Sequence, residues 1–229
     1  GIIRSSYVQG GTLTSNSLTA TGHAGFVGAN EAGGLIEGCW TSMAVNTTSE
    51  YAGGFVGLGY GGTIRNCFAL GNVSARGYSG GFVGRSVYGG NTYENCYAAG
   101  VVTVSGEQGN GFIGGNKPDS AFQYDQSKGV TNCYFNSAAA SAAAYGAVGK
   151  SLDEMKTDTF LTAISGSDSG VWAREADKNG GLPYLLGVAV PEAAVTAQIT
   201  VKLAIASYDK NSYTFNRMGD VITVTMDSN

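Results

Sequence analysis

The sequence predicts an all-β protein: a parallel β-solenoid, three-sided and wound right-handed, with about five coils. Two observations lead to this fold. One is a repeat of about 28 residues, the length of a three-stranded coil, and the other is the glycine-rich turns that separate its short β-prone segments. A third observation, a change in composition near residue 150, predicts that a different element follows the repeats. Residues 1–149 hold 31 of the 37 glycines but only 13 of the 30 charged residues.

The repeat carries two marks that keep the same phase. The first is a Gly-Phe-Val-Gly or Gly-Phe-Ile-Gly tetrapeptide, and the second is a cysteine followed by an aromatic residue. The tetrapeptides are Gly25–Gly28, Gly54–Gly57, Gly81–Gly84 and Gly111–Gly114; the pairs are Cys39-Trp40, Cys67-Phe68, Cys96-Tyr97 and Cys133-Tyr134. Tyr145–Gly149 reads as a fifth, degenerate copy. Two phased marks indicate that equal positions of successive coils lie on top of one another.

Alternation along the strands predicts which side chains point into the coil. Counted in steps of two from Cys67, the chain reads cysteine, alanine, glycine and valine, which favours an inward cysteine. We therefore expect a structural ladder of Cys39, Cys67, Cys96 and Cys133 and a repeat core of Phe26, Phe55, Phe82 and Phe112. A disulfide within the ladder is an alternative, although parallel, same-facing cysteines suit bridging poorly.

The same phase points the aromatic partners of the cysteines outward, unless a bend separates each pair. They are the candidate binding residues Trp40, Phe68, Tyr97 and Tyr134. Stacked rings on a rigid face suit a glycan or a protein surface. The competing interpretation is that the rings only stack on one another or are covered by loops, and we favour it.

Residues 150–187 are predicted to cap the C-terminal end of the solenoid, whose open strand edges need a cover. Ser151 and Glu154 form a capping-box pattern. One apolar helix stripe is expected from Leu152, Met155, Phe160, Leu161 and Ile164, with Trp172 and Tyr184 as bulky cover. Residues 188–229 are then a β-strand extension or the start of a truncated following domain, with strands expected at 197–207, 213–215 and 220–227.

The best copy, Tyr51–Gly57 followed by Thr63–Val73, resembles the GLUG repeat, whose pattern is close to G-G-[LF]-V-G, a turn, and I-x-N-[SC]-Y-A-x-G-x-V. The segments Lys150–Lys156 and Gly180–Leu185 are similar to the cap that often closes such arrays. The resemblance covers about residues 1–187. It implies a β-solenoid of bacterial surface, secreted or adhesin-like proteins, with no activity in the repeat itself. The insertion Lys117–Lys128 departs from the pattern.

Composition argues against several classes of function. The net charge is −4 with no basic stripe, which disfavours nucleic acid, and no apolar run is long enough for a membrane span. No signal peptide opens the chain, so we expect a segment of a larger exported protein, extracellular or at the cell surface. The cysteines lack the C-x₂-C spacing of zinc sites and His23 is the single histidine, so neither metal nor cofactor is expected.

The sequence therefore predicts a non-enzymatic structural or adhesive module. It would act as a rigid spacer whose candidate partners are a glycan, a host protein or a neighbouring surface protein. The alternative is a carbohydrate-active β-solenoid enzyme, a lyase or glycosidase, for which Asp119 and Asp125 are the aspartates available in the repeats. Both lie on one insertion, which favours a solvated loop.

Overall fold

A computed structural model describes residues 1–17, 22–87, 90–106, 109–115, 128–138 and 145–191, and the strands at 213–218 and 221–226. The chain divides into two compact units, Gly1–Pro191 and Glu192–Asn229. In the described residues, no helix is both long and apolar enough to cross a membrane.

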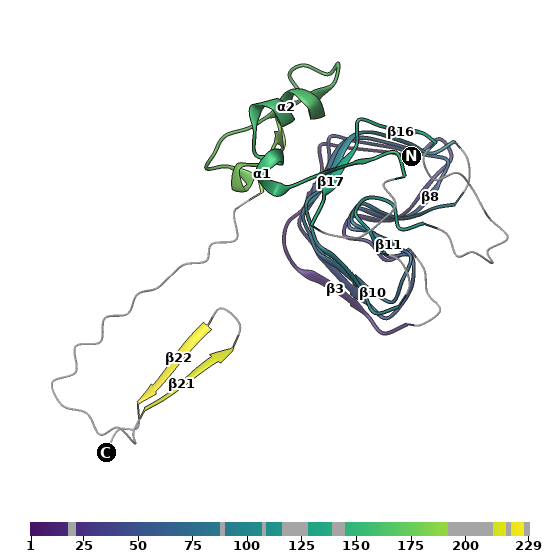
Figure 1. The fold of residues 1–229 in the computed structure, drawn as a ribbon. Helices are drawn as coiled ribbons and strands as arrows, with labels where there is room; N and C mark the ends of the chain where they lie inside the picture. Colours follow the sequence, from purple (N-terminus) through teal and green to yellow (C-terminus); the bar gives the residue numbers. More distant parts are fainter. Residues whose placement is uncertain are drawn as a thin grey trace. The chain divides into compact units, whose positions relative to one another are not determined.

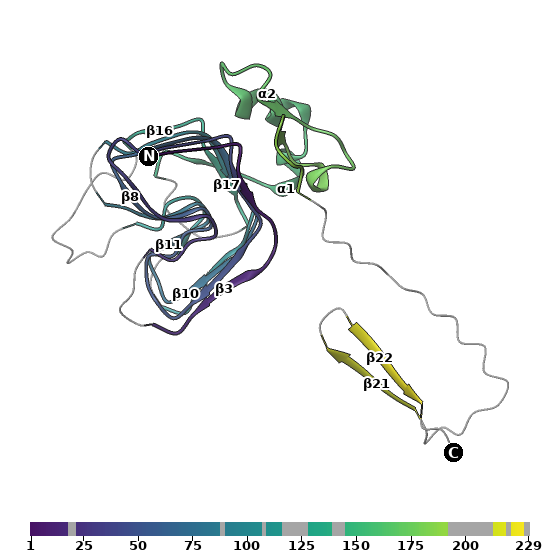
Figure 2. The same ribbon diagram turned by 180° about the vertical axis from the view of Figure 1, so that it is seen from behind.

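The first unit is a parallel β-solenoid, as the sequence predicts (Figures 1 and 2). Its largest sheet joins equal segments of successive coils in the order β1 (Ile2–Arg4), β5 (Leu35–Glu37), β9 (Thr63–Ala69), β13 (Thr92–Ala98), β17 (Tyr134–Asn136) and β18 (Val148–Lys150). Three short strands extend the same sheet: β2 (Tyr7–Val8), β6 (Trp40–Thr41) and β16 (Val130–Thr131). Every pairing in this sheet is parallel.

Three smaller parallel sheets complete the coils. The second sheet has the order β14 (Val102–Val104), β10 (Val73–Ala75), β7 (Ala44–Thr47) and β3 (Thr12–Ser15). The third has the order β12 (Val83–Ser86), β8 (Val56–Tyr60) and β4 (Val27–Glu31). A two-stranded sheet pairs β11 (Ser79–Gly80) with β15 (Gly109–Asn110). The chain visits these sheets in turn, which places equal repeat positions one above another.

The solenoid makes about three turns, slightly fewer than the five coils expected from the sequence. A complete turn needs a strand in every sheet, and the sheet β12-β8-β4 has three strands. The degenerate copy Tyr145–Gly149 contributes only β18 to the described sheets. The number of repeated motifs overestimates the number of turns, because each motif forms only one side of a coil and an incomplete coil can still carry one. The right-handed winding stays a prediction.

The core has three buried clusters. The first fills the coil and contains the cysteines and the repeat phenylalanines. The second lies between the aromatic partners of the cysteines and residues 155–185. The third contains Val45, Val73 and Val102, which belong to strands of the second sheet. Side chains are therefore buried on both faces of β9 and β13, which explains why burial alternates only at the start of these strands and then runs without a break.

Residues 150–191 form a cap, as the sequence predicts, but the cap does not cover the end of the solenoid. It contains α1 (Leu152–Met155), α2 (Asp158–Ser165), β19 (Trp172–Ala173), the 3₁₀ turn η1 (Asn179–Gly181) and β20 (Tyr184–Leu185). The capping box forms, since the Glu154 N–H donates to Ser151 Oγ and the Ser151 N–H donates to Glu154 Oε2. The expected apolar residues do not lie on one helix. They are divided between α1 and α2, because Thr157 begins the second helix by accepting a hydrogen bond from the Phe160 N–H.

The cap covers the side of the solenoid rather than its end. Trp172 packs against Phe68 and Tyr97, which lie on two successive coils, and α2 contacts β13. Figure 1 shows α1 and α2 outside the stacked coils, beside β17. The cap therefore buries a face that the sequence reading left open.

The second unit contains a β-hairpin of β21 (Tyr213–Met218) and β22 (Val221–Met226), antiparallel with Tyr213 opposite Met226. The strands expected at 213–215 and 220–227 fall on this hairpin. The strand expected at 197–207 lies outside the described residues.

Candidate functional site

The four cysteines lie in one buried stack inside the coil and are free thiols. Cys67 and Cys96 pair in register on β9 and β13, and the Cys39 N–H donates to Cys67 Sγ at 3.4 Å. Each thiol donates a hydrogen bond to the backbone carbonyl two residues earlier in the chain. For Cys67, the distance from Sγ to the Arg65 carbonyl oxygen is 3.1 Å. Buried, hydrogen-bonded thiols of this kind act as small core residues.

Burial has a clear effect on these thiols. It raises the pKa of Cys67, Cys96 and Cys133 well above the usual range. The pKa of Cys39 at the end of the stack is lowered instead, chiefly by its hydrogen bond with Cys67, and the Ser6 N–H adds to this by donating to Cys39 Sγ at 3.4 Å. The interior of the stack is thus held in the neutral form.

We expect the free energy of unfolding to fall as the pH rises above about 8.5, where thiols of an unfolded chain ionise. The folded state keeps its protons on Cys67, Cys96 and Cys133, so the unfolded state binds fewer protons and gains stability. Each thiol contributes at most about 1.4 kcal/mol per pH unit. Urea titrations from pH 7.5 to 10 with reductant measure the slope. Cys67→Ala should flatten it, and a pH-independent wild type would contradict the buried stack.

A corner in the chain separates each cysteine from the inward residue before it. Asn66, Asn95 and Asn132 precede the cysteines with φ of 52°, 51° and 52°, in the left-handed region. This conformation inserts one residue between inward Ile64 and inward Cys67, and Phe68 then faces the other side. Asparagine tolerates it better than other residues with a Cβ.

The corner asparagines also hold the cap. The Nδ2 atoms of Asn66 and Asn95 donate to Asp168 Oδ2 at 3.0 and 3.3 Å. The Trp172 Nε1 donates to Asn66 Oδ1 at 3.3 Å, and Asn132 donates to Asn95 Oδ1 at 2.7 Å. A row of amides at equal repeat positions therefore binds one carboxylate and one indole of the cap.

Substitutions at Asn95 should separate its two roles. Asn95→Gly keeps the left-handed backbone but removes the amide, at an expected cost of about 1–3 kcal/mol. Asn95→Ala loses the amide and adds about 1–2 kcal/mol of left-handed strain. Chemical denaturation of both variants gives the two terms. Gly38→Ala, at the same corner of an earlier coil with φ 63°, is the control for strain alone. Equal stability of wild type and Asn95→Gly would show that the amide contacts contribute nothing.

The aromatic partners form a column on the outside of the coil. Trp40 stacks on Phe68 with ring centroids 5.8 Å apart, and Phe68 stacks on Tyr97 at 5.0 Å. Trp172 lies tilted against Phe68 and Tyr97, while the Phe160 ring meets Tyr134 edge-on at 5.0 Å.

This column is not an open binding face. Trp40, Phe68 and Tyr97 are 0% exposed and Tyr134 is half-buried. Their polar atoms are also used, since Trp40 Nε1 donates to the Ala189 carbonyl and the Tyr97 hydroxyl to the Pro183 carbonyl. The candidate binding residues are therefore not an exposed row, in agreement with the favoured interpretation that the rings stack and are covered. A stripe of four large rings is better buried than hydrated, and the cap supplies the apolar partner.

A second column runs through the centre of the coil. Phe26, Phe55, Phe82 and Phe112 stack with centroids 4.7, 4.7 and 4.9 Å apart. The last three are fully buried, and Phe26 at the N-terminal end is half-buried. The residues shared by the repeats thus serve packing.

Several charged residues of the described coils lie in surface ion pairs. Glu37 forms ion pairs with Arg4 at 2.8 Å and with Arg65 at 2.6 Å. These arginines lower the pKa of Glu37, chiefly through the hydrogen bond from Arg4. Of the described residues, no three or more His, Cys, Asp or Glu side chains group as metal ligands do. The His23 carbonyl accepts from the Gly53 N–H, a backbone role. Asp119 and Asp125 lie outside the described residues.

One copy of the repeat was not recognised from the sequence. Residues 3–7 read Ile-Arg-Ser-Ser-Tyr and pair with the coil that carries Cys39-Trp40, so that Tyr7 stacks on Trp40 at 4.9 Å. Ser5 takes the left-handed corner with φ 47°. Serine replaces the cysteine in this copy, and the Ile-Arg pair shared with Ile64-Arg65 was the available signal.

Comparison with known proteins gives one match. Residues 48–74 match the GLUG motif. They include β8 and β9, with one Phe-column residue, one cysteine, its aromatic partner and one corner asparagine. Neither the curated proteins nor the solved structures contain a significant match to this chain. Residues 48–74 therefore carry a GLUG motif, and it lies within a parallel β-solenoid, as the resemblance of the repeats implies.

Proposed function

We propose that this chain is a non-catalytic structural module, a stiff spacer within a bacterial cell-surface or secreted protein. One observation carries the proposal: the side chains that recur in every repeat are used in packing. Cysteines and phenylalanines fill the coil, and the aromatic column is sealed by the cap. Repeats kept for stacking give a rod whose stability adds coil by coil.

The adhesive part of the proposal, binding of a glycan or host protein, is supported by the resemblance to GLUG-bearing surface proteins. Because the aromatic column is buried, such binding would use exposed side chains of the coils or the Lys117–Lys128 insertion. Ion pairs such as Glu50 with Arg76, 2.7 Å apart, leave fewer free acids on the coils for acid–base chemistry.

A screen of the purified chain tests the proposal. Incubation with polysaccharides and glycopeptides should release no reducing ends, unsaturated sugars or peptides, and binding is measured on the same panel by surface plasmon resonance. Binding without turnover supports the adhesive module, and neither binding nor turnover supports the plain spacer. Polysaccharide cleavage lost on Asp125→Asn would overturn the non-catalytic proposal.

A further inference from the structure

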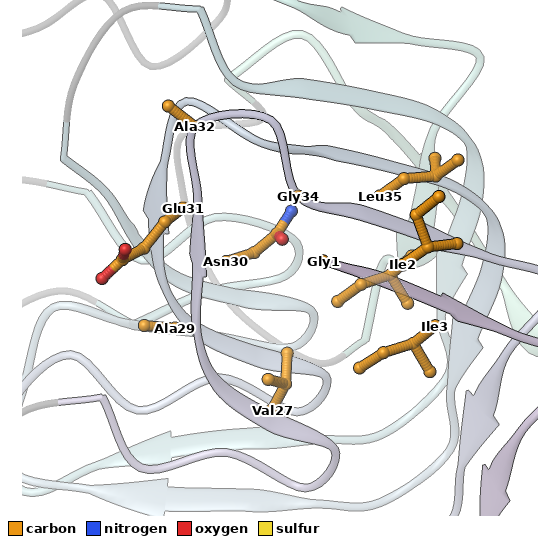
Figure 3. A pocket seen from close by; sticks show the side chains of 11 residues that line it. Gly1, Ile2, Ile3, Val27, Ala29, Asn30, Glu31, Ala32, Gly34 and Leu35 are labelled. Atoms are coloured by element: carbon orange, nitrogen blue, oxygen red, sulfur yellow. The ribbon is translucent and has the colours of Figure 1, made fainter.

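The described coils carry hollows on more than one side. One, of about 400 Å³, lies beside Gly1 between β1 and β4 (Figure 3), and nothing in the structure shows what covers it. Another, of about 360 Å³, lies on the outer face of the second sheet, away from the first coil. It is lined by three consecutive residues on each of three neighbouring coils: Asn46–Thr48, Ser74–Arg76 and Thr103–Ser105.

The parallel register makes this second hollow a straight groove across the coils. Alternate residues point outward and form two exposed rows. The first row contains Asn46, Ser74 and Thr103, which pair in register, and the second contains Thr48, Arg76 and Ser105. The floor between the rows is formed by Thr47, Ala75 and Val104. The rows are about 6.6 Å apart, because a strand rises about 3.3 Å per residue, and successive coils are about 4.8 Å apart.

The walls of the groove offer hydroxyl and amide groups without net charge. Arg76 is the one charged residue among those that line it, and Glu50 neutralises its guanidinium at 2.7 Å. Within the described residues, the side chains of the first row form no hydrogen bond with the protein. Hydroxyl and amide groups both donate and accept hydrogen bonds, so the first row is open to a ligand that does the same.

This chemistry fits a sugar chain better than a protein or a nucleic acid. Protein partners anchor on Trp, Tyr or Arg near the centre of an interface, and no aromatic residue lines the groove. Nucleic acid requires several cations for its phosphates, whereas the single arginine here is already paired. A glycan presents hydroxyls at regular intervals, and these exchange hydrogen bonds with hydroxyl and amide side chains.

We propose that this groove binds an extended, uncharged, β-linked glycan. The inference rests on the adhesive part of the proposed function and names its site and its class of ligand. One sugar ring with its linkage is about as long as the ~4.8 Å between coils. The glycan therefore runs along the stack of coils, at right angles to the strands, with successive rings at Asn46, Ser74 and Thr103. The groove is straight, so it selects extended β-linked chains over α-linked chains, which curve.

Three neutral hexasaccharides are the probes for this site: cellohexaose, mannohexaose and chitohexaose. Titrated into the intact, isotope-labelled chain, at least one should bind saturably at millimolar concentration or below and shift the amide resonances of Asn46, Ser74 and Thr103. Maltohexaose contains the same sugar as cellohexaose in α linkage. It should bind at least about tenfold more weakly than the best β-linked probe.

Variants of the chain locate the site. The triple variant Asn46→Ala/Ser74→Ala/Thr103→Ala removes the polar groups of the first row at exposed positions, and it should weaken binding at least about tenfold. Thr131→Ala, at an exposed position on β16 of the largest sheet, is the matched control and should bind as wild type does. Circular dichroism of the triple variant confirms that it is folded.

The outcomes separate this inference from the function on which it rests. Undiminished binding to the triple variant, or resonance shifts confined to other surfaces, would overturn the groove and leave adhesion to another face of the chain. Absence of saturable binding by all three β-linked probes at millimolar concentration would overturn the groove and favour the plain spacer. Equal affinity for maltohexaose would overturn the selection of extended chains by the groove.

Discussion

Phe82→Asp should abolish cooperative folding of the solenoid. Phe82 is fully buried between Phe55 and Phe112, with ring centroids 4.7 and 4.9 Å away. A carboxylate there has no partner, and burying one without compensation costs more than the few kcal/mol by which most domains are stable. Loss of the ring also interrupts the column that joins neighbouring coils. Circular dichroism and a urea titration should show no cooperative transition.

Val56→Asp tests the same core through an aliphatic residue, since Val56 is fully buried and pairs with Val27 and Val83. Thr103→Asp is the matched control, because Thr103 is exposed on β14, and its stability should change by no more than about 0.5 kcal/mol. Wild-type melting temperatures for both core variants would mean that the Gly-Phe-Val-Gly segments face solvent.

Trp172→Ala should destabilise the chain by about 3–5 kcal/mol and expose the aromatic column. The indole contacts Phe68 and Tyr97 at centroid distances of 5.9 and 5.8 Å and donates to Asn66. Its removal opens a cavity and leaves the Asn66 acceptor short of one donor. Chemical denaturation measures the loss, and increased binding of a hydrophobic dye to the folded protein reports the exposed column.

Leu186→Ala is the control for this variant, because Leu186 follows β20 and is 51% exposed. It should remain within about 0.5 kcal/mol of wild type. If both variants were equally stable, the cap would be resting on the column without stabilising it.

Much of the solenoid was predictable from the sequence, because a repeat of constant period must stack equal positions when its strands pair in parallel. The spacing of Cys67 and Cys96 gives the coil length, and the two residues do pair. The capping box at Ser151 and Glu154 was readable as well, since its hydrogen bonds span three residues. The number of complete turns was not, because each mark reports one side of a coil.

The sequence by itself determined that the chain is a β-solenoid and which residues recur in its coils. Only the tertiary structure decided that the outward aromatic column is covered. The contacts that cover it are remote in the chain: Asp168 lies 102 residues from Asn66, Trp172 lies 106 residues from it, and Ala189 lies 149 residues from Trp40. Periodicity reports which residues share a face of the coils. Whether water or another segment meets that face depends on long-range packing, which no local pattern encodes.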